Sequence, residues 1–108
     1  FVNDSAVDVY LQKLALDSSI DPELVIQSLR VMRMRAPVRA SLDAALTLSR
    51  TSSERATVRS EALYTIAHHA PLAADEVRQA LTQTAREGNS QLAQQAQQLL
   101  AKLPRAKD

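Results

Sequence analysis

Apolar side chains recur every three or four residues along most of the chain, in segments separated by polar or proline-containing breaks. The clearest segment, residues 51–70, carries its apolar stripe at Val58, Ala62, Leu63, Ile66 and Ala67. Thr51 and Glu54 have the spacing of a capping box, and Pro71 disfavours helical geometry in the residue before it. This pattern predicts one amphipathic helix, which needs neighbours because a single helix is marginal in water.

The remaining segments predict five more helices, within residues 3–17, 21–36, 37–50, 72–88 and 89–103. Asp21 and Pro22 form a strong start signal, in which Asp caps the helix and Pro occupies its first position. Pro37 is expected to open the third helix, and Gly88 to end the fifth in a left-handed cap. The short connections make successive helices antiparallel neighbours.

The helix pattern repeats along the chain. In the even-numbered helices a step of 34 residues relates three columns, namely Leu24, Val58 and Leu92; Ser28, Ala62 and Ala96; and Met32, Ile66 and Leu100. In the odd-numbered helices a step of 35 relates Val7, Leu42 and Val77, and Leu11, Leu46 and Leu81. Helix pairs at this period are typical of α-solenoids. We therefore predict one all-α domain over residues 1–108, a right-handed α-solenoid of three antiparallel pairs (residues 4–34, 37–69 and 72–103). An unrelated six-helix bundle is the alternative.

The fourth helix also resembles a known family. Residues 54–69, with Val58-Arg59, Ala62-Leu63 and Ile66-Ala67, look like the second helix of a HEAT or HEAT-like repeat, and residues 89–103 and 21–34 are weaker copies. The resemblance implies stacked pairs whose second helices line a concave side. The family's aspartate before that helix is matched by Asp21 alone, and its arginine after the valine by Arg59 alone. Tetratricopeptide repeats share the period, but their glycine and bulky aromatics are missing here.

Composition narrows the chemistry. The 108 residues include no cysteine, which excludes disulfides, thiolate zinc sites and a cysteine nucleophile. A single glycine leaves no Gly-rich nucleotide loop, and a net charge of +1 gives no global attraction for nucleic acid. No apolar run is long enough to span a bilayer, and no signal peptide is visible. We expect a soluble chain, and because it begins with Phe1 we take it for a processed protein or a segment of a longer one.

No group of residues has the spacing of a catalytic or metal site. His68 and His69 are adjacent, so they point about 100° apart and do not form the i, i+4 pair of a helical metal site. A histidine pair at a helix C-terminus, where it interacts with the helix dipole, is the favoured interpretation. The hydroxyls of Thr51 and its neighbours are more typical of caps than of nucleophiles. We expect no enzyme, no cofactor and no metal.

The 34-residue step also aligns polar positions of the even-numbered helices, in the columns Arg30, Tyr64 and Gln98; Gln27, Glu61 and Gln95; and Met34, His68 and Lys102. These columns are mixed in charge and can form hydrogen bonds, which suits a protein segment better than a phosphate backbone. The predicted partner-binding residues are Arg30, Arg33, Met34, Glu61, Tyr64 and Gln98. The expected function is a non-enzymatic scaffold or interaction module for a protein or peptide, or for other domains of its own chain.

Three surface features keep alternatives open. The basic cluster Arg30, Arg33, Arg35 and Arg39 could bind nucleic acid as a HEAT-like domain, or it could be a solvated face. The glutamines of the last helix could be a terminal cap or a partner surface. Val31 and Met34 widen the apolar arc of the second helix, and they could fill a groove or form an exposed patch.

Overall fold

All regular structure in the described part of the chain is α-helical. The computed structural model describes residues 5–17, 19–50, 56–87 and 90–103. Its helices are α1 (Ser5–Ala15), α2 (Pro22–Arg33), α3 (Arg39–Arg50), α4 (Ala56–His68), α5 (Ala74–Ala85) and α6 (Ser90–Lys102). The all-α class and the order of helices are therefore as the sequence predicts.

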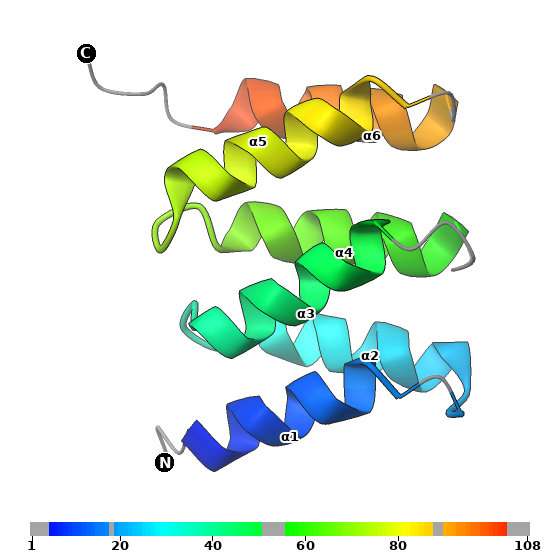
Figure 1. Cartoon of the computed structure of the whole chain (residues 1–108), viewed down its shortest axis with the longest axis vertical. Coiled ribbons are helices and arrows are strands. Elements are labelled where there is room, and N and C mark those ends of the chain that lie inside the picture. Colours follow the sequence, from blue (N-terminus) through cyan, green and yellow to red (C-terminus); the bar gives the residue numbers. More distant parts are fainter. Residues whose placement is uncertain (1–4, 18, 51–55, 88–89, 104–108) are drawn as a thin grey trace.

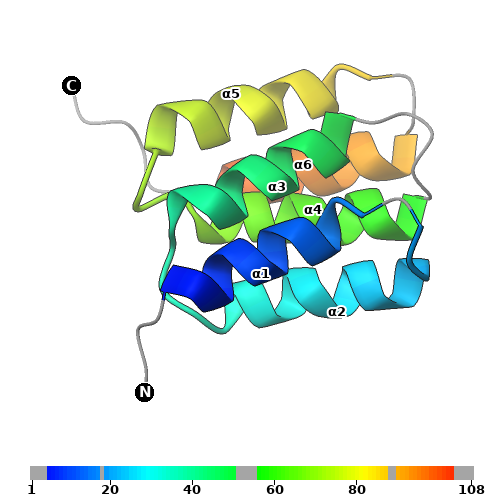
Figure 2. The ribbon, with the colours of Figure 1, turned by 60° about the horizontal axis from the view of Figure 1, so that its bottom comes forward.

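The helices lie in two layers, with α1, α3 and α5 in one and α2, α4 and α6 in the other (Figures 1 and 2). Within each pair the helices run antiparallel, and helices of the same layer run parallel (Figure 1). In the even-numbered layer α2 packs on α4 and α4 packs on α6. In the odd-numbered layer α1 packs on α3, but α3 and α5 do not pack closely. The even-numbered layer is therefore continuous, whereas the other layer opens between its second and third helices.

The helix ends follow the local sequence signals. The N–H of Glu23 donates to Oδ1 of Asp21 at 2.9 Å, and Pro22 occupies the first turn of α2, as predicted. Helix α4 ends at His68, close to the stop predicted from Pro71. Helix α3 begins at Arg39, so the prediction that Pro37 opens it was early by two residues. Proline removes an N–H donor, and the first backbone bond here runs from Leu42 to the carbonyl of Val38. The capping box predicted at Thr51 and Glu54 and the cap predicted at Gly88 lie outside the described residues.

The core lies between the two layers and includes most of the predicted columns. Ser28, Ala62 and Ala96 are all nearly inaccessible, at 2%, 0% and 0% exposure. Small side chains in this column let neighbouring helices approach closely, because there is little volume between the backbones to fill. The column Leu11, Leu46 and Leu81 is likewise buried.

One prediction about burial was wrong, and one buried charge was not predicted. Leu24, which the sequence places in the apolar stripe of its helix, is 45% exposed, whereas Val58 and Leu92 of the same column are buried. The column faces the preceding even-numbered helix, and α2 is the first of its layer in the described chain. Arg59, the residue after Val58, is only 9% exposed although it is charged. Its polar partners, described below, make this burial possible.

Candidate functional site

The predicted binding residues converge first at the junction of α2 and α4. Arg30 and Arg33 project from α2 and both pair with the Glu61 carboxylate, at Nη2–Oε distances of 3.0 and 2.8 Å. Nη1 of Arg33 also donates to the Glu61 carbonyl and to the Thr65 hydroxyl, at 3.1 Å each. One guanidinium therefore contacts three acceptors on α4, which fixes the register between the two helices.

These arginines affect the pKa of Glu61 and the orientation of the Tyr64 ring. Partial burial pushes the pKa of the Glu61 carboxyl upward, but the hydrogen bonds from Arg30 and Arg33 outweigh it, and the net shift is downward. The Arg33 guanidinium lies over the Tyr64 ring, 5.8 Å from its centroid. Tyr64 keeps 46% of its surface exposed, so its orientation is set by a cation on one side while the remainder faces solvent.

A groove of about 250 Å³ follows at the junction of α4 and α6. Its lining consists of Ala56, Thr57, Ser60, Glu61, Gln91, Leu92 and Gln95. Ser60 and Gln95 are linked by two hydrogen bonds, from the Ser60 hydroxyl to Oε1 at 2.7 Å and from Nε2 to the Ser60 carbonyl at 2.9 Å. Glu61 belongs to both this groove and the ion pair, so the two junctions form one surface, which we call the even-helix face.

The other two predicted residues lie apart from this cluster. Gln98 is exposed on α6, one turn beyond Gln95. Met34 is the C-terminal cap residue of α2 and is 83% exposed. Four of the six predicted residues therefore meet in one network, while Gln98 and Met34 are exposed positions at its margins.

Carboxylates accompany every arginine of the predicted basic cluster. Arg30 and Arg33 share Glu61, as described above. Nε of Arg35 donates to Oδ1 of Asp8 at 2.7 Å, which ties the end of α2 to α1. Arg39 pairs with Glu76 of α5 at 2.7 Å and with Asp43 at 3.0 Å. The Arg39 hydrogen bonds lower the pKa of the Glu76 carboxyl. Sequence spacing does not reveal these pairs, because each except Arg39–Asp43 joins different helices.

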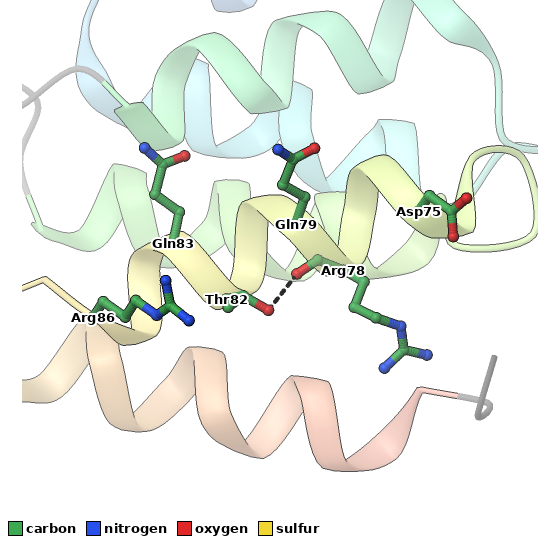
Figure 3. A pocket seen from close by; sticks show the side chains of 6 residues that line it. All are labelled: Asp75, Arg78, Gln79, Thr82, Gln83 and Arg86. Carbon is green, nitrogen blue, oxygen red and sulfur yellow. Dashed lines mark hydrogen bonds between the residues drawn. The ribbon is translucent and has the colours of Figure 1, made fainter.

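A second hollow, of about 570 Å³, lies along α5 and was not predicted (Figure 3). It is lined by Asp75, Arg78, Gln79, Thr82, Gln83 and Arg86. Gln79 and Gln83 project from one side of α5 and the two arginines from the other, and the Thr82 hydroxyl donates to the Arg78 carbonyl at 2.8 Å (Figure 3). A sequence signal existed, since the step of 35 places Gln79 and Gln83 where α3 has Ala44 and Leu48. Those two residues are buried, whereas the glutamines are exposed.

The histidine pair is divided between two structural roles. Nε2 of His68 lies 2.9 Å from the Arg35 carbonyl, which links the ends of α4 and α2. His69 is fully buried, with Nδ1 2.7 Å from the Thr65 carbonyl and Nε2 without a hydrogen-bond partner. Burial lowers the pKa of His69. Across residues 5–17, 19–50, 56–87 and 90–103, no three histidine, aspartate or glutamate side chains are placed to hold a metal ion.

Arg59 is a buried cation whose polar partners lie at the ends of two other helices. Its Nε and Nη2 donate to the Ser49 carbonyl near the end of α3, at 3.0 and 2.8 Å. Nη2 also donates to Oε1 of Glu87, just beyond α5, at 2.7 Å. One side chain of α4 thus joins the ends of two other helices.

No family model, curated protein or solved structure matches this chain. Within its described portion, no helix combines the length and the apolar character needed to cross a membrane.

Proposed function

We propose that this chain is a non-enzymatic interaction module, built as a right-handed HEAT-like solenoid of three helix pairs, that holds an extended segment of a protein partner on its even-helix face. Two features support the solenoid arrangement. The small-residue column Ser28, Ala62 and Ala96 is buried at every rung, and the even-numbered helices pack consecutively. The opening between α3 and α5 leaves the even-numbered layer as the more tightly packed side, as expected for the concave surface of a curved stack.

The observation that carries the proposed binding site is the groove between α4 and α6 beside Tyr64. Most of its polar lining is uncharged and presents hydroxyl and amide groups, which can pair with the N–H and C=O groups of an extended peptide. Tyr64 adjoins it as a half-exposed aromatic already oriented by Arg33. Tyrosine is enriched among residues that dominate binding energy, because it buries a large area at a small entropic cost. The exposed Gln98 extends the same surface along α6.

The charge arrangement favours a protein partner over nucleic acid. Affinity for a phosphate backbone comes from cations that release counterions on binding. Here Arg30, Arg33, Arg35 and Arg39 each face a carboxylate at 3.0 Å or less. Binding phosphates would require these pairs to separate, and the local field that could attract DNA or RNA is correspondingly weak.

The test begins with a displayed library of random peptides, from which those that bind the folded chain are selected. The affinity of each selected peptide is then measured for the original chain and for its variants. Tyr64→Ala is expected to weaken binding by about tenfold or more, the loss typical of an aromatic hot spot. Tyr10→Ala is the matched control, because Tyr10 is 63% exposed on α1, away from this face. Arg30→Glu should also weaken binding, since it removes one partner of Glu61 beside the groove.

Two outcomes would contradict the proposal. One is that selected peptides bind Tyr64→Ala and Arg30→Glu as well as the original chain. The other is saturable binding of duplex or single-stranded DNA that weakens steeply between two salt concentrations, because this would restore the basic cluster as the functional surface.

A further inference from the structure

Exposed apolar side chains are concentrated at one end of the stack. Among the described residues, the large apolar side chains with substantial exposure on the first helix pair and its connection are Val9, Tyr10, Leu16, Leu24, Val31 and Met34. Beyond this pair the exposed large apolar residues are Tyr64 and Leu72, and neither α5 nor α6 carries one. Isolated surface apolar residues are ordinary, but a set gathered on one helix pair and edged by polar residues marks a surface that another element covers.

The repeat identifies what this surface is. A step of 34 residues relates Leu24 to Val58 and Leu92, and Val31 to Thr65 and Leu99. Leu24 and Val31 are 45% and 39% exposed, whereas their equivalents are 0% exposed on α4 and 3% and 9% exposed on α6.

The equivalent positions on α4 face the preceding helix. The Thr65 hydroxyl lies 3.3 Å from the Leu29 carbonyl of α2 and accepts from Arg33 at 3.1 Å. Leu24 and Val31 therefore occupy the edge by which, at the other rungs, an even-numbered helix packs against the one before it.

A polar position on the same edge supports this equivalence. At both internal junctions the residue in this column reaches back to the preceding helix, Glu61 to Arg30 and Arg33, and Gln95 to Ser60. Gln27 occupies the column on α2 and is exposed. Because Gln27 has the same side chain as Gln95, it is suited to the same partner, a hydroxyl and carbonyl presented by a neighbouring helix.

We propose that the outer edge of α2, formed by Leu24, Gln27 and Val31, receives an amphipathic helix of a partner polypeptide lying parallel to α2. The α4–α6 junction defines the chemistry of this occupant. The partner helix carries a serine or a similar hydroxyl residue opposite Gln27, as Ser60 lies opposite Gln95. About one turn later it carries an apolar residue of the size of leucine, where α4 has Leu63. This edge is separate from the even-helix groove, so the proposal does not depend on the function proposed above.

A second copy of this chain does not meet that description. Its free edge would be the outer side of α6, where the step of 34 places Gln94 and Gln97 at the positions of Ser60 and Leu63. Both glutamines are exposed. Head-to-tail stacking would press the Gln97 amide against the apolar edge of α2 with no partner there to satisfy it.

The probe is a synthetic peptide with the sequence of residues 56–68, stapled as a helix through positions 58 and 65, which in α4 face the preceding helix α2. It is titrated into the whole chain while the amide and methyl chemical shifts are followed by NMR. We expect saturable binding, with shifts concentrated at Leu24, Gln27 and Val31. Val31→Asp in the chain should weaken binding at least tenfold. Leu72→Asp, at an exposed apolar residue on another surface, should leave it unchanged.

A second peptide, in which the leucine at position 63 is replaced by glutamine as in α6, should bind at least tenfold more weakly. Absence of binding, shifts centred on another surface, or equal affinity for the Val31→Asp chain would each overturn the proposal. So would concentration-dependent dimerisation of the chain alone in sedimentation equilibrium, if Val31→Asp abolishes it, because the occupant would then be a second copy. Tyr64→Ala should not change this titration, so its result is independent of the peptide-binding face.

Discussion

Arg59 offers the sharpest test of how the helices are held together. The side chain is nearly buried, and it donates twice to the Ser49 carbonyl and once to the Glu87 carboxylate. Ser49 is the penultimate residue of α3, and the last carbonyls of a helix have no partner within it. Replacing Arg59 by Met retains an apolar stem of similar length but leaves the Ser49 carbonyl buried without this donor.

The size of the effect follows from these contacts. A hydrogen bond with one charged partner contributes about 1.5–3 kcal/mol, and the forked bond to Ser49 is counted once, at about 2 kcal/mol. The Glu87 side chain is 35% exposed, so its ion pair is screened by solvent and contributes less than about 1 kcal/mol. Arg59→Met should therefore destabilise the fold by about 2–3 kcal/mol, which for a domain of this size lowers Tm by about 10–20 °C.

Chemical denaturation and thermal melting, both followed by circular dichroism, measure this change. Arg50→Met is the matched control, because Arg50 follows Ser49 at the end of α3 but is exposed. Its replacement should lower the unfolding free energy by less than about 0.5 kcal/mol. Glu87→Gln removes the ion pair but keeps the hydrogen bonds to the Ser49 carbonyl, so it should lower the unfolding free energy by less than about 1 kcal/mol. An unfolding free energy of Arg59→Met within about 0.5 kcal/mol of the original chain would contradict this role of Arg59, and so would an equal loss for Glu87→Gln.

Two further predictions concern the buried residues of α4 and the turn after it. Burial lowers the pKa of His69 below its unfolded value, so the unfolded state binds the extra proton. The unfolding free energy should therefore be highest above about pH 6.5 and should decrease as the pH falls below that value. In denaturation measured from pH 7.5 to 5.5, His69→Leu should make this decrease smaller. Ala62 is fully buried, so Ala62→Leu should overpack the core and cost about 1–3 kcal/mol in the same assay. Ala101→Leu, at an exposed position of α6, should cost little, and equal losses for the two alanines would refute the packing argument.

The helices and much of the core could be predicted because their signals are local. Asp21 and Pro22 start α2, Pro71 follows the end of α4, and the column Ser28, Ala62 and Ala96 is buried as its spacing indicated. Leu24 has the same apolar character as Val58 but is exposed, because burial depends on whether a neighbouring helix is present. Periodicity identifies an apolar face and cannot report what covers it.

The polar contacts of the site were harder to predict, because they join residues distant in sequence. The alignment of Arg30 and Tyr64 placed them on one face, and the structure brings them together through Glu61 and Arg33. The spacing did not reveal that Glu61 pairs with both arginines, since that pairing depends on the register of α2 against α4. The hollow along α5 was also missed, although the step of 35 places Gln79 and Gln83 at the positions of two buried residues of α3.

The most direct test of the even-helix face is the NMR footprint of a library-selected peptide on the whole chain. We expect the largest shifts at Thr57, Glu61, Tyr64, Gln95 and Gln98, on α4 and α6, and we expect them to disappear with Tyr64→Ala. A footprint centred on the hollow along α5, at Gln79 and Gln83, would contradict this expectation and would transfer the binding function to the opposite layer.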